Sequence, residues 1–210
     1  ATGNALYKTA SGSTSANPTS DDQTYLGSGL PKDTYGFANT ITYKNLSLDF
    51  LFDAVTGNKV FDATRVETEG MYISGNASTA VLNRWRKPGD ITDVPAAYYG
   101  GTNSAGASTI LPSSRFIENG AFVRLKSLSL GYLIKSSALE KQGIKIRVFA
   151  TAQNLFTITK YKGYYPEVNT FSGSSQSGGS LGAPSSTAVG IDYGTYPQTK
   201  TYTAGLNVTF

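Results

Sequence analysis

A serine between glycines is the first candidate for covalent chemistry. Residues 178–182 read GGSLG, which matches the G-x-S-x-G pattern of a nucleophilic serine at a strand-to-helix turn. A general base would have to activate Ser180, but the chain contains no histidine. The motif also lies in a run of glycine and serine, so we interpret it as coincidental. Without histidine or cysteine, the chain also lacks the commonest metal ligand and thiolate chemistry. We expect no enzyme, no cofactor and no metal site.

Two aspartates are the second candidate. Asp49 and Asp53 share one face of the segment LSLDFLFDA. Four residues along a strand separate their backbones by about 13 Å, beyond the usual spacing of glycosidase carboxylates. We therefore interpret them as solvated carboxylates.

The elements that position these residues are predicted to be strands. Apolar residues alternate with polar ones in five segments, residues 35–43, 46–54, 121–134, 145–156 and 202–210. Lys44 and Asn45 alone separate the first two segments, which indicates a tight hairpin. A short helical turn is expected over 137–141. In the third segment the apolar positions change from odd to even residue numbers. This change predicts a bulge at 126–128.

Composition supports an all-β fold. Charged residues make up only 15% of the 210 residues, and the polar-neutral remainder suits exposed β-structure. The 18 basic residues exceed the 14 acidic ones by four, but they are scattered, so we expect no nucleic-acid partner.

The lengths of the connections favour a membrane barrel. The connections at 44–45 and 135–143 are short, whereas those at about 55–120 and 157–197 are long. Outer-membrane barrels have short periplasmic turns and long extracellular loops, and compact soluble domains rarely contain such loops. A soluble β-sandwich, whose strands also alternate, stays open as an alternative.

Several longer motifs point to a family. RFIENGAFVRLKSLSLGYLI, RVFATAQNLFTITKYKGYYPEV and GIDYGTYPQTKTYTAGLNVTF resemble the C-terminal end of the SusC/RagA family of TonB-dependent outer-membrane transporters. Three further segments support the same family and occur in the order that the family uses: DDQTYLGSGLP, TYKNLSLDFLFDAVTGNKVFD and VLNRWRKPGDITDVPAA. The resemblance covers residues 21–210.

The resemblance implies a function. Family members form a 22-stranded barrel closed by an N-terminal plug and capped by a SusD-like surface lipoprotein. They import glycans or peptides in Bacteroidetes-type bacteria, and TonB powers the import through the plug. Residues 1–210 would be the C-terminal barrel segment in outer-membrane lipid, without the plug and the N-terminal strands. Residues 7–20 lack the family's aspartate- and glycine-rich loop, so we expect no calcium there.

Two other functions stay open. A SusC-like barrel that no longer transports could serve as a scaffold subunit of an envelope complex. A secreted β-sandwich that binds carbohydrate is the weaker alternative.

The barrel interpretation assigns roles to individual residues. Alternation places one set towards lipid: Leu46, Leu48, Phe50, Phe52, Leu206 and Val208. Charged residues are costly in lipid, by about 2 to 4 kcal/mol each at the midplane for arginine and lysine. A second set should therefore face the lumen, where it could contact the plug or a substrate: Asp49, Asp53, Arg124, Lys126 and Arg147. Thr203 and Asn207 should share that side.

Loop and terminal residues complete the assignment. Aromatic residues of the long loops could contact substrate or the lid, or pack the loops together: Trp85, Tyr98, Tyr99, Tyr161, Tyr164 and Tyr165. Phe210 is expected to act as the barrel-assembly signal. The segment NALYK at 4–8 could be a sixth strand. Five or six strands are too few for a barrel, so the first and last strands should pair with other parts of the transporter.

Overall fold

The computed structural model describes residues 3–71, 75–98, 111–168 and 189–210. Contacts divide the chain into two compact units. Unit 1 consists of Ala1–Gly27, Val60–Glu118 and Asn169–Gly194. Unit 2 consists of Ser28–Lys59, Asn119–Val168 and Thr195–Phe210. None of the helices in the described ranges is long and apolar enough to cross a membrane.

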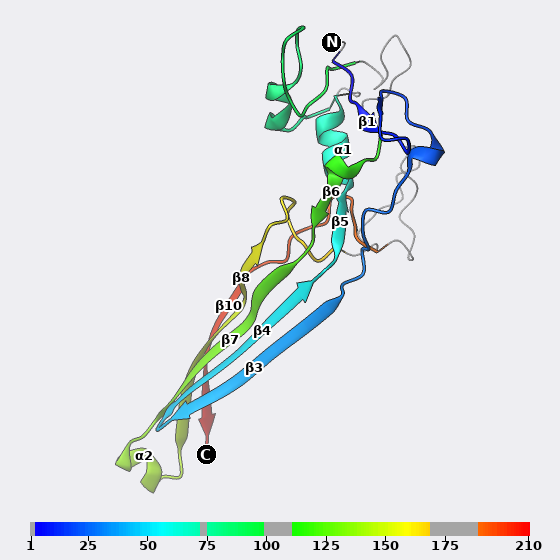
Figure 1. The fold of residues 1–210 in the computed structure, drawn as a ribbon. Helices are drawn as coiled ribbons and strands as arrows, with labels where there is room; N and C mark the ends of the chain where they lie inside the picture. Colours follow the sequence, from blue (N-terminus) through cyan, green and yellow to red (C-terminus); the bar gives the residue numbers. More distant parts are fainter. Residues whose placement is uncertain (1–2, 72–74, 99–110, 169–188) are drawn as a thin grey trace. The chain divides into compact units, whose positions relative to one another are not determined.

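Unit 2 is built on one antiparallel sheet of five strands. The strands are β3 (Asp33–Tyr43), β4 (Leu46–Thr56), β7 (Phe122–Ile134), β8 (Lys145–Thr159) and β10 (Thr201–Thr209). Their spatial order is β10-β8-β7-β4-β3, and Figure 1 shows them lying side by side. The five predicted strands are confirmed. The sheet is open, because β3 and β10 each pair with only one strand of the described chain.

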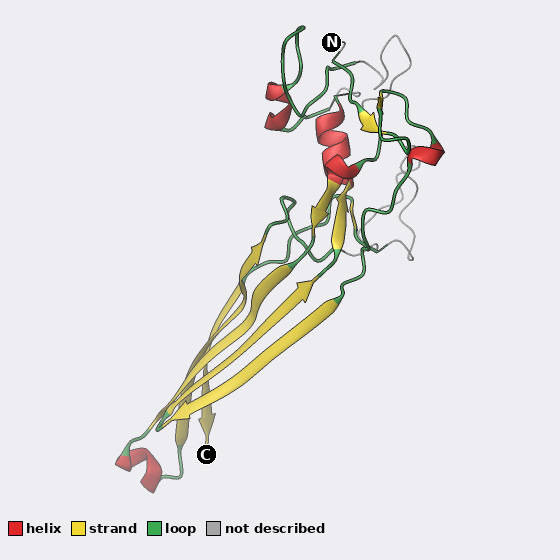
Figure 2. Ribbon diagram, viewed as in Figure 1, coloured by secondary structure: helices red, strands yellow, loops and turns green. Residues whose placement is uncertain are grey.

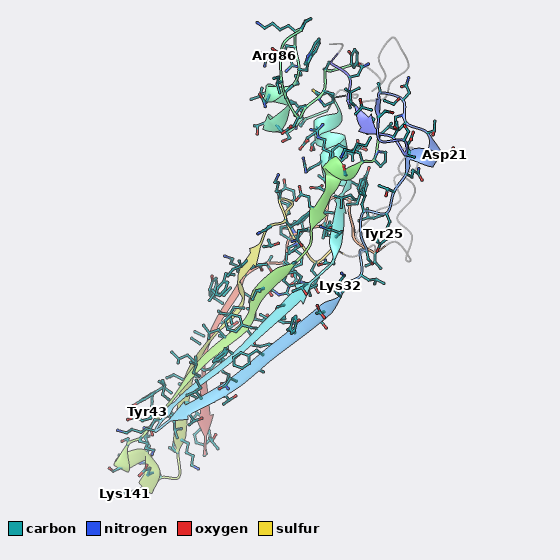
Figure 3. The ribbon with its side chains drawn as sticks, viewed as in Figure 1. Asp21, Tyr25, Lys32, Tyr43, Arg86 and Lys141 are labelled. Atoms are coloured by element: carbon teal, nitrogen blue, oxygen red, sulfur yellow. The ribbon has the colours of Figure 1, made fainter. Side chains whose placement is uncertain are left out.

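The two short connections lie at one end of this sheet. Lys44, with a φ of 54°, begins the two-residue turn between β3 and β4, and the Leu133 amide donates to the Asn45 carbonyl at 2.9 Å. The predicted helical turn is α2 (Ser137–Lys141) between β7 and β8. Figure 3 shows Tyr43 and Lys141 at this end and Lys32 at the other. The short connections are therefore grouped, as the sequence predicted.

The predicted bulge is confirmed at Lys126. On β4, Leu51 pairs with Ser127 and Phe52 with Leu125, so Lys126 is skipped. On β8 the same break skips Asn154, whose φ is 52°, and Leu155. An extra residue changes which face the following side chains occupy. The bulge thereby restores Val123 and Leu125 to the face that carries Leu128.

Strand register sorts the side chains of unit 2 onto two faces. Residues directly opposite in an antiparallel pair share a face. We call one side the apolar face, and its large members are Tyr35, Phe37, Ile41, Tyr43, Leu46, Leu48, Phe50, Phe52, Val123, Leu125, Leu128, Leu130, Tyr132, Ile134, Ile146, Val148, Phe156, Ile158, Tyr202, Leu206 and Val208. We call the other side the polar face, and it includes Thr40, Ser47, Asp49, Asp53, Arg124, Ser129, Arg147, Thr203 and Asn207.

Unit 1 consists of short elements. The strands are β1 (Tyr7–Lys8), β2 (Thr14–Ser15), β5 (Lys59–Asp62), β6 (Ile117–Asn119) and β9 (Ile191–Asp192). The helices are α1 (Ala63–Gly70) and the 3-10 turns η1 (Ser20–Asp22), η2 (Thr79–Asn83) and η4 (Ser114–Phe116). Figure 2 shows these helices as short segments. The core contains Val60, Ala63, Val66 and Phe116.

The possibility of a sixth strand at NALYK is wrong. β1 pairs with β2 in a separate two-stranded sheet. A tight turn folds this segment back on itself, because the Thr9 amide donates to Ser13 and the Gly12 amide donates to Thr9, both at 2.9 Å. Gly12, with a φ of 83°, makes that turn possible. The strand thus uses its hydrogen bonds locally.

Candidate functional site

The apolar face of unit 2 is exposed. Phe37 and Leu206 on the two outer strands are 58% and 59% exposed, and Leu130 of the central strand β7 is 46% exposed, whereas Leu125 of β7 is buried. Aromatic rings also run across neighbouring strands: Phe37 to Phe50 at 5.7 Å and Phe52 to Phe156 at 6.2 Å between ring centroids. Monomeric soluble proteins rarely expose an apolar patch that extends over a whole sheet. The face therefore requires an apolar environment outside the described residues.

The polar face carries an ion-pair cluster centred on Arg124. Its guanidinium makes two hydrogen bonds to the Asp53 carboxylate, one of them 3.0 Å from Nε to Oδ1. Nη1 donates to Glu167 Oε2 at 2.8 Å. The side chain of Arg124 is only 3% exposed. It is compensated by two carboxylates, so it can be buried without an unpaired charge.

Aromatic rings enclose the Arg124 guanidinium. Its carbon lies 5.3 Å from the centroid of Phe122 and 5.7 Å from that of Tyr165. The Tyr165 hydroxyl donates to Glu167 Oε2 at 3.0 Å. These contacts fasten the segment that follows β8 to the sheet, at the end opposite the two short connections.

A second polar arrangement lies near the short connections. Arg147 Nη2 donates to Ser47 Oγ at 3.0 Å, and the guanidinium lies over Gly131. A Cβ atom at Gly131 would be only 2.4 Å from Arg147 Nη2. Glycine at this position therefore gives the long side chain room to lie across three strands.

The remaining charged candidates make fewer contacts. Asp49 accepts a hydrogen bond from Thr40 Oγ1 at 2.7 Å. Lys126 is exposed in the bulge. The register thus places four of the five predicted charged residues on one face, and it pairs Asp53 with Arg124. Sequence reasoning missed Glu167, which lies 43 residues from its partner and in no alternating segment.

The loop aromatics differ in their surroundings. Tyr161 and Tyr165 are buried, whereas Tyr164 is 77% exposed. Trp85 lies against Gly3, and the Tyr98 hydroxyl donates to Asn4 Oδ1 at 3.4 Å. Tyr99 lies outside the described residues, as does the Ser180 motif. A role in substrate or lid contact stays a prediction for all six.

The remaining predictions concern Phe210 and metal binding. Phe210 follows β10 and is 90% exposed, and its role in assembly stays a prediction. The described ranges contain no group of three or more acidic, histidine or cysteine side chains suited to a metal ion. In residues 7–20, where no calcium is expected, the Ala10 amide donates to the Asp22 carboxylate at 2.9 Å.

The sequence is similar to proteins that are named TonB-dependent receptors. The chain is 34% identical over 190 residues to TonB-dependent receptor P3 of Formosa agariphila, covering 90% of this chain and 17% of that protein. It is 29% identical over 182 residues to TonB-dependent receptor SusC of Bacteroides thetaiotaomicron, covering 83% and 15%. The chain thus spans about a sixth of the length of these relatives.

Solved structures agree with the sequence relatives. The RagAB peptide importer in its closed-closed state superimposes with a TM-score of 0.74 at 28% identity, over 98% of this chain and 21% of the other. No protein-family model matches the chain.

Proposed function

The chain belongs to the SusC/RagA family of TonB-dependent receptors, and we propose that it supplies part of the barrel wall of an outer-membrane nutrient importer. The observation that carries the proposal is the predominantly apolar face of the five-stranded sheet, which Asn39 alone interrupts between Tyr35 and Tyr43 on β3 and which is opposed by a polar face. The apolar face is energetically favourable in contact with lipid, and the polar face is favourable in contact with a water-filled lumen.

The same proposal orients the sheet in the membrane. The turn at Lys44 and Asn45 and the helix α2 lie on the periplasmic side, and the long loops lie on the extracellular side. The Arg124 cluster then lies towards the extracellular rim. Arg147 and Ser47 lie towards the periplasmic side, where they face the plug or the transport route.

The open edges of the sheet indicate which partners the chain needs. Unpaired backbone groups at the edges of β3 and β10 would cost several kcal/mol each in hydrocarbon, and single-chain barrels of bacteria begin at eight strands. The remaining strands and the plug of the same receptor complete the barrel. A SusD-like lipoprotein covers the loops, and TonB acts through the plug.

Uptake measurements test this function. A strain that lacks the receptor gene is complemented with the full-length receptor, and accumulation of fluorescent oligosaccharides and oligopeptides is compared with and without TonB. TonB-dependent uptake of either class supports import and identifies the nutrient. No uptake of either class, together with a disturbed envelope after deletion of the gene, would favour the scaffold function instead.

Fractionation tests the location in the same strain. The importer should remain with the outer membrane until detergent is added. Recovery of the chain in the culture medium without detergent would favour the secreted carbohydrate-binding alternative.

A further inference from the structure

Two buried aspartates meet where the two long connections touch each other within unit 1. β5 and β9 are parallel, and their register pairs Asp62 with Asp192. The two residues are 130 positions apart in the sequence, yet Asp62 is 1% exposed and Asp192 is 2% exposed. Burial beside a second carboxylate opposes the ionisation of Asp62, because water is excluded and like charges repel.

Specific backbone contacts hold the β9 segment on β5 and α1. The Phe61 amide donates to the Gly190 carbonyl at 2.8 Å. The Gly194 amide donates to Thr64 Oγ1, at the start of α1, at 2.9 Å. Residues 189–194 therefore attach to both β5 and α1, and Asp192 lies in the sequence between the two residues that make these hydrogen bonds.

The surrounding charges leave Asp62 poorly compensated. Arg65 of α1 is engaged by Glu69 at 2.7 Å and by Glu118 of β6 at 2.6 Å. Arg115 of η4 is engaged by Glu69 at 2.5 Å. Asp62 Oδ1 accepts the Arg65 amide at 3.0 Å. Both arginines near Asp62 are thus already engaged by glutamate side chains.

We propose that Asp62 forms a proton-dependent clasp with its register partner Asp192, which fastens residues 189–194 to β5 and α1 when Asp62 carries a proton. Protonation of Asp62 removes its repulsion from Asp192, whereas ionisation of Asp62 favours release of the β9 segment. The inference goes beyond the import function and does not depend on it.

The electrostatics give the direction of the effect. Burial raises the pKa of Asp62 from 3.8 to about 6, the hydrogen bond from the Arg65 amide opposes the rise, and the charge of Asp192 adds to it. The docked state therefore binds its proton more tightly than the released state. Docking gains stability as the pH falls through about 6, and it loses that gain as the pH rises again.

Hydrogen exchange in the full-length receptor measures the clasp. Protection factors, corrected for the intrinsic effect of pH, are followed for peptides that contain the Phe61 and Gly194 amides. Between pH 7.5 and pH 5, protection should increase about tenfold if the pKa of the released state is the ordinary one. A change of less than threefold would overturn the proposal.

Three variants separate the clasp from general effects of pH. Asp62→Asn keeps an oxygen to cap α1 and should give high protection without dependence on pH. Asp192→Asn removes the like charge, so the midpoint should move to lower pH. Asp90→Asn is the control, because Asp90 accepts the amides of Arg86 and Lys87 elsewhere in unit 1, and it should behave as the wild type.

The variants also give results that overturn the idea. Retention of the tenfold change in Asp62→Asn would assign the titration to another group. If Asp62→Asn does not fold, the wild-type profile and the midpoint of Asp192→Asn decide. An unmoved midpoint in Asp192→Asn would exclude coupling between the two carboxylates.

Discussion

Replacing Phe50 by lysine should strongly destabilise the membrane-inserted barrel. Phe50 lies four residues from the start of β4, which is about 14 Å along the strand. With a strand tilt of about 40°, this places it about 10 Å above the periplasmic rim, near the middle of an apolar band of about 25 Å. Its ring lies 5.7 Å from that of Phe37 and 5.9 Å from that of Phe52.

Two terms determine the size of the effect. A lysine at the midplane of the lipid face costs about 2 to 4 kcal/mol. Loss of the two ring contacts adds about 0.5 to 1.5 kcal/mol each. We therefore expect the free energy of unfolding to fall by about 3 to 7 kcal/mol, with less heat-modifiable receptor in the membrane.

The measurement is guanidinium unfolding of the full-length receptor in lipid vesicles. Leu51→Lys is the matched control, because Leu51 is the next residue of β4 but lies on the polar face. It should cost less than about 1 kcal/mol, since a lysine there reaches the lumen. Equal losses in the two variants, or a loss below 1 kcal/mol for Phe50→Lys, would refute the assignment of the apolar face to lipid.

Three other substitutions follow from the contacts of unit 2. Arg124→Met leaves two carboxylates without their shared cation, and unfolding experiments should show a loss of about 2 to 4 kcal/mol; a loss under 0.5 kcal/mol would contradict its role in holding the segment after β8. Gly205→Ala places a Cβ 2.3 Å from the Phe149 ring and should cost about 1 to 3 kcal/mol by the same measurement, whereas Gly36→Ala meets open space and should cost under 1 kcal/mol. Deleting Lys126 removes the bulge residue and turns part of β7 to the wrong face, so folded receptor should be lost from the outer membrane, while Lys126→Ala should insert normally; normal insertion of the deletion would show that the bulge does not fix the register.

Much of unit 2 could be predicted from the sequence because strand information is local. Alternation with a period of two reports which side chains share a face, and the parity break in FVRLKSLSL located the bulge within the predicted residues. The turn at Lys44 and Asn45 followed from the two residues that separate the strands. Such patterns arise within about ten neighbouring residues, so they do not depend on the rest of the chain.

The charged face could be predicted only in part. Asp53 and Arg124 were expected on the same side, since their strands alternate, and the structure pairs them. Glu167 was not expected, because no periodic pattern extends beyond β8. The NALYK segment was considered as a sixth strand, but it pairs with β2 through a turn at Gly12, and such a turn leaves no periodic pattern in the sequence.

The contacts made by the long connections could be known only from the tertiary structure. The sequence by itself determined the strands, their two faces and the family, since each rests on local pattern or on ordered motifs. Only the fold brought Glu167 to Arg124 and Asp192 to Asp62. Loop segments meet through a few specific hydrogen bonds and ion pairs between distant residues, and those contacts leave no periodicity in the sequence.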